Sequence, residues 1–402
     1  MWPALLTLGV LATWGASASI VAADDGPVGP GISLELPLVY VLTSPISRLL
    51  DLLTLLSVPQ TIAFFVLAAL VTVLASVPRA RRSNRPLTSF LVTLGAIVLV
   101  TVLLEAAVAF APRPMARIAI EDPDVVVVDF HTHTNASRDA NQRFTAEDRR
   151  DWHRDGGFNI GYITDHVRFG AATEAARRNP ERAGLAVSEL VAVEGRYHRI
   201  ISTIMLGLTQ GDSALLDSRG RLLPGATLSG RKPVTIVTLP NRNLDSITLA
   251  SLDSIPNFAA IELVDAAPRG LAQLDRDEAK VRRMSKDLQL VLVAASNNHG
   301  YGRTVAAWNL LTVHGWRDMR PDSVGHLIEE SLRRRDMSSV TVVKRLRPRT
   351  VGVSTAFTLP IGVFQTLGSL TATERVVWLG WIWCIAIIVD IGRRRRRSQI
   401  SA

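Results

Sequence analysis

The segment VVVVDFHTHTNASRD, residues 125–139, joins a run of apolar residues to two histidines. Four consecutive valines and a phenylalanine are typical of a strand buried on both faces of a sheet. Residues two apart in an extended chain project to the same side, so the imidazoles of His131 and His133 can bind one cation at about 2.0–2.1 Å. The segment therefore predicts a buried strand that carries metal ligands at its C-terminal end, with Asp139 close behind.

The same arrangement, an apolar run followed by a polar residue with a nitrogen or oxygen ligand, recurs further along the chain. The runs and their polar residues are 159–164 with Asp165 and His166, 189–194 with Glu194, and 289–295 with Asn297 and His299. A single histidine near a strand is usually structural, but four such strand ends favour a shared site. Functional residues of βα barrels lie at the C-terminal ends of the strands. The lone cysteine, Cys384, excludes a cysteine-based zinc site.

Apolar β-branched runs alternate with polar, helix-like stretches between residues 118 and 348. Further strands are predicted over 234–239 and 259–264, with weaker ones over 309–313 and 340–344, and helices are predicted over 145–155, 171–178, 268–286 and 321–335. Near-continuous apolar strands separated by helices indicate βα units around a parallel sheet. We predict an α/β fold in which 118–348 forms a barrel of seven or eight such units.

Hydrophobic residues make up 48% of the 402 residues, a high share for a soluble protein. A membrane-spanning helix takes about 20 apolar residues. Candidate spans are 2–22, 60–77, 88–111 and 376–391. The first can also be interpreted as a secretion signal, and the sequence leaves open whether residues 1–23 are a signal anchor, a transmembrane helix or a cleaved signal.

Arginines are concentrated in two stretches, 78–87 and 392–402, each beside an apolar segment, in a chain of net charge +9. Arginine-rich loops stay on the cytoplasmic side of a membrane. This pattern predicts a multi-pass protein of the cell membrane whose barrel domain lies outside the cytoplasm, with 24–59 and 349–374 as extracytoplasmic or juxtamembrane segments. The charge is better explained by membrane topology than by a nucleic-acid surface, so no nucleic-acid partner is expected.

Four motifs resemble the successive motifs of the PHP (polymerase and histidinol phosphatase) superfamily. They are DFHTHT at 129–134, ITDH at 163–166, VEG at 193–195 and SNNHG at 296–300. The similarity covers about 125–305. It implies a distorted (β/α)7-type PHP barrel, here flanked by transmembrane helices, with two or three divalent metal ions and a phosphoesterase activity.

The resemblance also implies the metal ligands. They are His131, His133, Glu194 and Asn297 in one site, and Asp139, His166 and His299 in another. Asn297 stands where the family usually has Asp, so it can ligate through its carbonyl but brings no charge. Leu239 replaces a family histidine of the remaining site, and ISTIML at 201–206 lacks a second one unless His198 takes its role. We therefore expect one or two Zn, Mn or Fe ions, with three as the upper limit.

Two residues are predicted to act in catalysis beside these ligands. Asp165 can orient a water or a histidine from behind the ligands, and Arg303 can clamp a phosphate. Other candidate phosphate ligands are Arg138, Arg196 and Arg199. His153 lies in a charged helical stretch and is predicted to be on the surface.

These expectations combine into a membrane-anchored, metal-dependent phosphoesterase that acts on a phosphorylated small molecule or a lipid-linked envelope substrate. Two alternatives stay open. Paired histidines after a first barrel strand also occur in amidohydrolases, although no lysine near a strand end is evident here. Leu239 and Asn297 favour a barrel that has lost activity and serves as a binding module.

Overall fold

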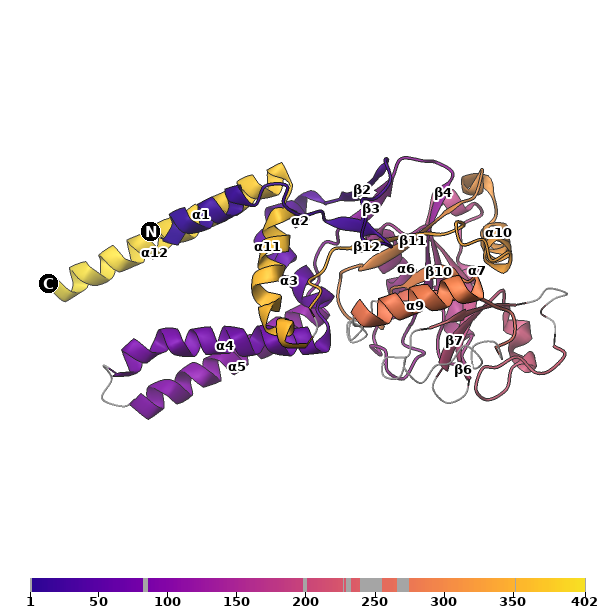
Figure 1. The fold of residues 1–402 in the computed structure, drawn as a ribbon, viewed down its shortest axis with the longest axis horizontal. Coiled ribbons are helices and arrows are strands. Elements are labelled where there is room, and N and C mark those ends of the chain that lie inside the picture. Colours follow the sequence, from indigo (N-terminus) through magenta and orange to yellow (C-terminus); the bar gives the residue numbers. More distant parts are fainter. Residues whose placement is uncertain are drawn as a thin grey trace.

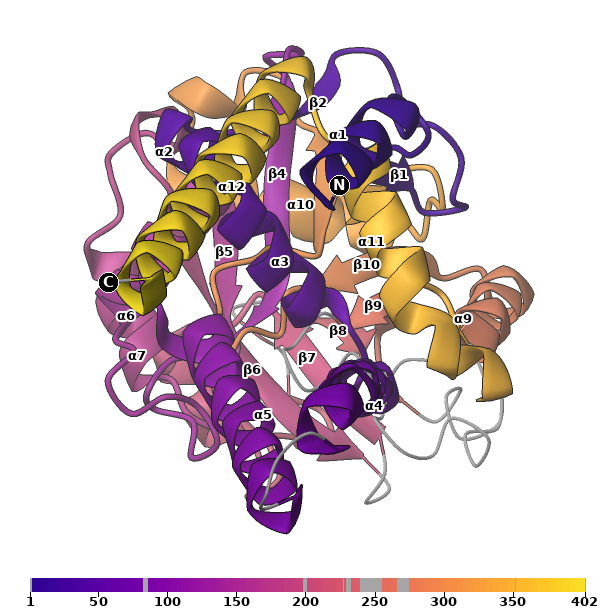
Figure 2. The same ribbon diagram turned by 90° about the vertical axis from the view of Figure 1, so that its left-hand side faces the viewer.

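The computed structural model describes residues 2–81, 86–197, 201–226, 228, 233–238, 255–265, 275–350 and 352–401. An α/β body carries a curled sheet, and long helices project from one side of that body (Figure 1). Seen from the side of these helices, the sheet lies behind them (Figure 2).

The curled sheet contains ten strands in the described part of the chain, in the order β1-β12-β11-β4-β5-β6-β7-β8-β9-β10. Their bounds are Ile20–Ala22 (β1), Val125–Thr132 (β4), Ile160–Ile163 (β5), Ser188–Tyr197 (β6), Ile201–Leu206 (β7), Val234–Val237 (β8), Phe258–Asp265 (β9), Val291–Ala295 (β10), Ala307–Thr312 (β11) and Thr341–Arg345 (β12). The eight strands expected from the sequence correspond to β4–β6 and β8–β12. The sequence did not indicate β1 or β7.

The sheet is mixed, whereas the apolar runs predicted a parallel one. Strands β4, β5 and β6 are parallel, and so are β8, β9 and β10. However, β7 is antiparallel to β6 and β8, and β11 is antiparallel to β4 and β12. Only residues 198–200 separate β6 from β7, and a parallel crossover needs a dozen residues or more. The described strands therefore do not establish seven βα units.

The sheet curls until β10 lies against β4. Asn309 on β11 joins the two strands, because its Nδ2 donates to the carbonyls of Val128 (3.0 Å) and Ala294 (2.8 Å). Beyond the strands, the backbone amide of His133 donates to the carbonyl of Asn298 at 3.1 Å. The closure places the C-terminal ends of β4 and β10 side by side, although these strands are far apart in the chain.

Four helices pack on the sheet and agree with the predicted ones. They are α6 (Ala146–Gly156), α7 (Gly170–Arg177), α9 (Asp275–Leu288) and α10 (Pro321–Arg333). The predicted start of the third helix, at 268, lies outside the described residues. Helix α6 begins at a capping box, in which the Thr145 hydroxyl accepts from the Asp148 amide at 3.2 Å. It ends at Gly157, whose φ of 85° suits a left-handed C-cap.

Three helices in the described part of the chain are long and apolar enough to cross a membrane. They are α4 (Val58–Arg81), α5 (Pro86–Phe110) and α12 (Ala372–Ser401), with candidate spans Val58–Val77, Leu87–Phe110 and Ala372–Arg395. These spans correspond to the predicted segments 60–77, 88–111 and 376–391. Helices α4 and α5 form a hairpin that projects from the body (Figures 1 and 2).

The expected span over 2–22 is not a single helix. Helix α1 (Trp2–Ala12) has 11 residues and lies along α12, and β1 then pairs with β12 in the main sheet. The helix ends at Ala12, shortly before Gly15 adopts a φ of +68°, and Arg375 donates to the carbonyls of Val10 and Thr13. The β-branched residues that follow suit a strand better than a helix.

Short elements connect the long helices to the body. They are β2 (Ile32–Glu35) paired with β3 (Arg117–Ile120), α2 (Leu38–Leu42), α3 (Ser44–Leu55) and α11 (Thr358–Gly368). Most residues of α3 are buried, so this part of the segment 24–59 packs against the rest of the protein.

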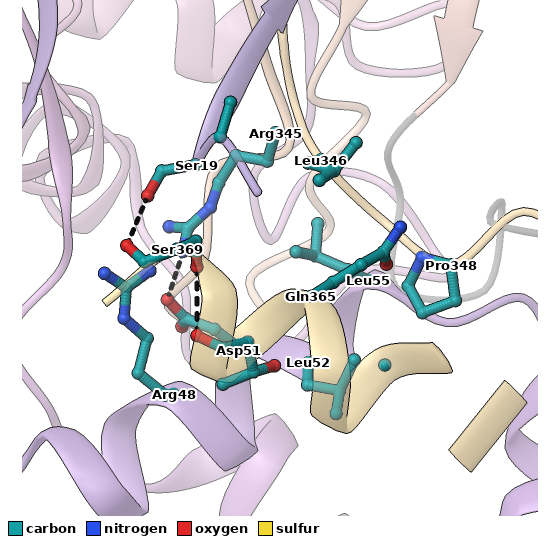
Figure 3. A pocket seen from close by; sticks show the side chains of 13 residues that line it. Ser19, Arg48, Asp51, Leu52, Leu55, Arg345, Leu346, Pro348, Gln365 and Ser369 are labelled. Atoms are coloured by element: carbon teal, nitrogen blue, oxygen red, sulfur yellow. Dashed lines mark hydrogen bonds and ion pairs between the residues drawn. The ribbon is translucent and has the colours of Figure 1, made fainter. Parts of the chain in front are cut away.

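A set of buried polar residues, here called the junction cluster, joins α3 to the body. Asp51 of α3 is its centre and accepts hydrogen bonds from Arg113 (2.6 Å), Tyr40 (2.7 Å), Thr304 (2.7 Å) and Arg345 (2.9 Å). Burial alone would raise the pKa of Asp51, but Arg345 and Arg113 hold that pKa at about 2. Figure 3 shows Arg345 reaching Asp51 from β12.

The junction cluster also includes a bidentate ion pair between two helices. Arg48 on α3 donates from Nε and Nη2 to the two carboxylate oxygens of Glu374 on α12, both at 2.7 Å. The space beside Asp51 measures about 30 Å³, room for a water rather than a substrate. The cluster is therefore a structural link between the long helices and the sheet.

Candidate metal centre

The first group of predicted ligands converges at the C-terminal end of β4. The Nε2 atoms of His131 and His133 lie 3.0 Å apart. Oε2 of Glu194, on β6, lies 3.7 Å from the first of these nitrogens and 3.5 Å from the second. All three side chains are buried. Three ligand atoms that face one another at these separations can hold one cation.

A second group lies beside the first and shares His133 with it. His133, His166 and His299 each direct a ring nitrogen to a common point. Oδ2 of Asp139 lies 3.4 Å from Nε2 of His166 and 3.5 Å from Nε2 of His299. The predicted second site is thus brought together, with His133 as an additional member.

Glu194 links the two groups through one oxygen. Its Oε2 also lies 2.9 Å from Nδ1 of His166, so this oxygen faces three histidines. A carboxylate in this place can bridge two neighbouring cations. We call the six residues the strand-end cluster: His131, His133, Asp139, His166, Glu194 and His299.

The ring nitrogens that point away from the centre have hydrogen-bond partners of their own. Nδ1 of His131 lies 2.8 Å from Oε1 of Glu262 on β9, and Nδ1 of His299 donates to the backbone carbonyl of Asn297 at 2.8 Å. Metal-binding histidines usually donate their second nitrogen to a carboxylate or carbonyl in this way. These partners hold both rings with Nε2 directed toward the other members of the group.

His133 is oriented through a hydroxyl. Its Nδ1 lies 3.1 Å from Oγ of Ser137, and this hydroxyl donates its single hydrogen to Oδ1 of Asp165 at 2.8 Å. Because the serine hydrogen is used, Nδ1 of His133 must be the donor to Ser137, and its Nε2 keeps the lone pair.

Asp165 lies behind the ligands rather than among them. It is fully buried and also accepts from the amide (2.8 Å) and the hydroxyl (2.6 Å) of Thr134. Of the two roles considered for Asp165, the structure favours the orientation of a histidine.

Asn297 is placed between the ends of β4 and β10. Its backbone amide donates to the carbonyl of His131 at 2.8 Å, and its side-chain Nδ2 donates to Asp265 at 3.1 Å. Its Oδ1 is buried and has no hydrogen-bond partner in the described part of the chain. An unpaired buried carbonyl oxygen is costly, and a cation would satisfy it.

The electrostatics of the cluster suit a divalent cation. Burial, together with His299 and His131, lowers the pKa of His133 well below 6.5, which keeps this ring neutral. Burial alone would raise the pKa of Glu194, but its hydrogen bonds to His131 and His166 lower that pKa well below 4.5. Neutral imidazoles and ionised carboxylates are the forms that bind metal. The donor set therefore fits one or two divalent ions.

At two histidines of the cluster, protons compete with a metal for the ring nitrogens. Burial would lower the pKa of His131, but the carboxylates of Glu262 and Glu194 raise it well above 6.5. The pKa of His166 is also raised, because Glu194 and Asp139 outweigh the effect of its burial. A cation would have to displace these protons.

An open cleft leads to the cluster. Asp139, His166 and Glu194 line it. Four exposed arginines line it as well: Arg138, Arg168, Arg196 and Arg219. The first and third were predicted as phosphate ligands. Arg168 was not, although it follows the ITDH motif by two residues. Arg219 could not have been found from its position in the sequence. It lies at the cleft next to Arg196, whose backbone amide donates to the Arg219 carbonyl at 2.9 Å.

The structure does not place Arg303 at the cleft. Its Nη2 pairs with Asp155 of α6, and its Nε donates to the carbonyl of Arg113 at 2.8 Å. Arg303 follows the SNNHG motif, but the intervening glycine turn directs the chain towards α5. The predictions for Leu239, His198 and Arg199 concern residues outside the described part of the chain.

His153 is buried rather than exposed, which corrects the prediction. Its Nδ1 lies 2.7 Å from Glu189, and its Nε2 lies 3.4 Å from Asp129. The charged stretch around it is amphipathic, and His153 falls on the inner face of α6 together with Trp152. Asp129 in turn accepts from the amide of His131 at 3.3 Å, so this buried histidine supports the base of the centre.

Glu262 and Asp265 are two further site residues that the sequence interpretation missed. Both lie on β9, which was predicted as a strand over 259–264. Asp265 ends that strand, the same signal that identified the ligands elsewhere. Glu262 lies within an apolar run, AAIELV. A single acidic residue inside an apolar strand indicates a carboxylate that faces the interior, and this signal could have identified Glu262.

No protein-family model matches the chain, and no curated protein matches it either. Among solved structures, PsfC from Pseudomonas syringae is 16% identical, with 60% of this chain and 96% of that chain covered at a TM-score of 0.36. An amidohydrolase from Chromobacterium violaceum with bound sulfate and no metal is 15% identical, with coverages of 54% and 97% and a TM-score of 0.34. A two-domain protein from Bacteroides vulgatus that contains a predicted PHP-like metal-dependent phosphoesterase is 12% identical, with coverages of 59% and 70% and a TM-score of 0.35. At these identities and TM-scores the likeness does not establish a family for this chain.

Proposed function

We propose that this protein is a membrane-anchored, metal-dependent phosphoesterase. The observation that carries the proposal is the strand-end cluster itself. Six side chains from four separate stretches of the chain meet, and each has a ligand atom 2.9–3.7 Å from that of at least one other member. Histidine nitrogens and carboxylate oxygens that converge in this way form a donor set that a divalent cation can bind.

The proposed metal-binding residues are the six of the strand-end cluster, with Asn297 Oδ1 as a further candidate ligand. Divalent cations at such a centre supply a water that is deprotonated near neutral pH and neutralise charge on a phosphate. Glu262, Ser137 and Asp165 keep the histidines in the orientation and tautomer that this needs.

The cleft favours a phosphate ester over a neutral substrate. Its four arginines have no ion-pair partner in the described part of the chain, so they are available to an anion. Guanidinium groups bind phosphate oxygens in a bidentate manner. In the proposed reaction a water oxygen attacks phosphorus, the ester P–O bond breaks, and the alcohol leaves with a proton.

The long helices support a location in the cell membrane with the cleft outside the cytoplasm. The end of α4, the start of α5 and the C-terminal end of α12 all lie on the side away from the α/β body (Figure 1). The arginine-rich stretches 78–87 and 392–402 belong to these ends. Arginines at one end of several spans mark the cytoplasmic side, which leaves the body on the other side.

The test is hydrolysis of a generic aryl phosphate by the purified full chain with added Mn²⁺ or Zn²⁺. We expect turnover that a chelator removes and that His133→Ala abolishes. The matched control is His314→Ala, because His314 is exposed, pairs with Asp124 and lies outside the cluster. Bound metal without turnover of phosphate esters or amides would contradict an enzyme and favour a binding module. Turnover of amides alone would favour an amidohydrolase.

A further inference from the structure

The metal centre lies next to the outer end of a candidate membrane span. His299, a member of the strand-end cluster, is followed by Gly300, Tyr301 and Gly302. The amide of Gly302 donates to the carbonyl of Ala109 at 2.9 Å, in the last turn of α5. The candidate span Leu87–Phe110 ends in that same turn.

Further contacts hold this loop against the end of the span. The rings of Phe110 and Tyr301 pack edge to face, with centroids 5.7 Å apart. Asn298, which bridges to the end of β4, donates from its side chain to the carbonyl of Tyr301 at 2.8 Å. The ligand loop and the membrane helix are therefore one connected structure rather than two parts joined by a linker.

The chain length between them limits their separation. Three residues, fully extended, cover at most about 11 Å, so His299 lies within that distance of Gly302. The polar layer of a bilayer adds about 5–8 Å on each side of its hydrocarbon core. These lengths are comparable, so in a bilayer that α5 spans the centre would lie near the level of the lipid headgroups. Phe110 is 64% exposed, as expected for an aromatic residue at a membrane surface.

The cleft that leads to the centre carries more positive than negative side chains. Arg138, Arg168, Arg196 and Arg219 contribute four guanidinium groups, against the carboxylates of Asp139 and Glu194. A phosphate that belongs to a lipid in the same leaflet would need no diffusion from bulk water to reach it. A soluble ester would gain nothing from the attachment of the ligand loop to α5.

We propose that the substrate is a lipid that carries a phosphate ester in its headgroup, an inference that rests on the proposed function. The lipid would come from the outer leaflet of the membrane in which the protein is anchored. The cluster residues bind the reacting phosphate, and the four arginines select an anionic headgroup. The long helices then serve both to anchor the domain and to place the cleft at the depth of the substrate.

The experiment compares lipid and soluble esters that share a headgroup. The full chain is reconstituted in phosphatidylcholine nanodiscs with Mn²⁺ or Zn²⁺. One pair of probes is phosphatidic acid and glycerol 3-phosphate, and a second pair is phosphatidylglycerol and its deacylated diester. We expect kcat/KM to be about 10²-fold higher for the lipid member of one pair, because confinement to a surface raises the effective concentration.

The arginines are tested with a double variant, Arg168→Ala with Arg219→Ala. We expect kcat/KM for the lipid to fall tenfold or more, mainly through KM, at unchanged metal content. Arg283→Ala is the matched control, because Arg283 is an exposed arginine on α9. It should change neither value.

The outcomes separate this inference from the proposed function. Equal turnover of lipid and soluble members, or turnover of the soluble members and aryl phosphate alone, would overturn the lipid substrate and leave the phosphoesterase intact. If no phosphate ester is hydrolysed although metal is bound, the proposed function fails and this inference fails with it. A double variant that behaves like Arg283→Ala would overturn headgroup selection by the arginines.

Discussion

The junction cluster and the strand-end cluster both contain buried charged side chains, but they differ in how charges are matched. In the junction cluster each oxygen of Asp51 faces an arginine, and Glu374 pairs with Arg48 through both of its oxygens. In the strand-end cluster the Nε2 atoms of His131 and His133 lie 3.0 Å apart. There, a single oxygen of Glu194 faces three histidines.

The difference indicates what each cluster is for. A buried ion pair with matched partners holds segments together and is strongly destabilising only when one partner is removed. In the strand-end cluster several potential metal ligands face one another without such one-to-one pairing, an arrangement that a bound cation would stabilise. We infer that the junction cluster is complete within the chain and that the strand-end cluster is complete only with a cation.

The largest expected effect is on the free energy of unfolding, when the carboxylate of the junction cluster is removed. Asp51→Asn leaves Arg113 and Arg345 buried without a counter-charge and should lower the free energy of unfolding by about 3–5 kcal/mol. Denaturation of the full chain in detergent measures it. The control Glu35→Gln breaks an exposed pair with Arg117 and should cost less than about 1 kcal/mol. Equal stability of the Asp51 variant and the wild type would contradict the comparison.

Metal binding should stabilise the protein through the other cluster. A divalent ion at 100 times its Kd adds about 2.7 kcal/mol to the free energy of unfolding, because it binds only the folded state. Thermal unfolding with Zn²⁺ or Mn²⁺ and with a chelator measures the shift in Tm. His314→Ala should retain it and His166→Ala should not. A Tm that no cation changes would refute the cation requirement.

Glu262 tests whether the residues around the strand-end cluster support metal binding, because it contacts the ligand His131 without being a ligand itself. Glu262→Gln replaces the carboxylate that orients His131 by a neutral amide. This change should lower metal affinity by about 10–100-fold. Glu278→Gln is the control: this buried carboxylate pairs with Lys344 and Arg349, so its loss should reduce stability at unchanged metal affinity. If both variants bind metal equally well, Glu262 has no role in ligand orientation.

The smallest expected effect is on the pH dependence of metal binding. In the metal-free protein the pKa values of His131 and His166 are raised above 6.5, so both rings hold protons at pH 6.5. A cation displaces them, and metal affinity should therefore rise from pH 6.5 upwards, by no more than about tenfold per unit for each proton released. Calorimetry in buffers of different ionisation enthalpy counts the protons. Uptake of protons on binding would reverse the predicted sign.

Much of the metal centre could be predicted from the sequence, because its ligands follow apolar strands directly. His131, His133, His166 and His299 each come within four residues of such a run, and strand ends meet when a sheet curls. The helices α4, α5 and α12 could be predicted equally well, because length and apolarity alone mark a candidate span.

The parts that the sequence did not reveal depend on partners far along the chain. Glu262 and Arg219 reach the site through strand pairing and a backbone hydrogen bond, and neither lies in a motif. His153 was misplaced because a charged stretch hides which face of a helix is buried. Residues 2–22 look like a span by composition, but Gly15 and the pairing of Ile20–Ala22 with β12 divide them.

The central claim is tested most directly by the metal content of the purified full chain, measured by elemental mass spectrometry after dialysis against Zn²⁺ or Mn²⁺. The account predicts one or two equivalents per chain in the wild type and in His314→Ala, and a loss of at least one equivalent in His133→Ala, whose ring belongs to both ligand groups. A wild type without bound metal, or a His133 variant with full occupancy, would contradict it.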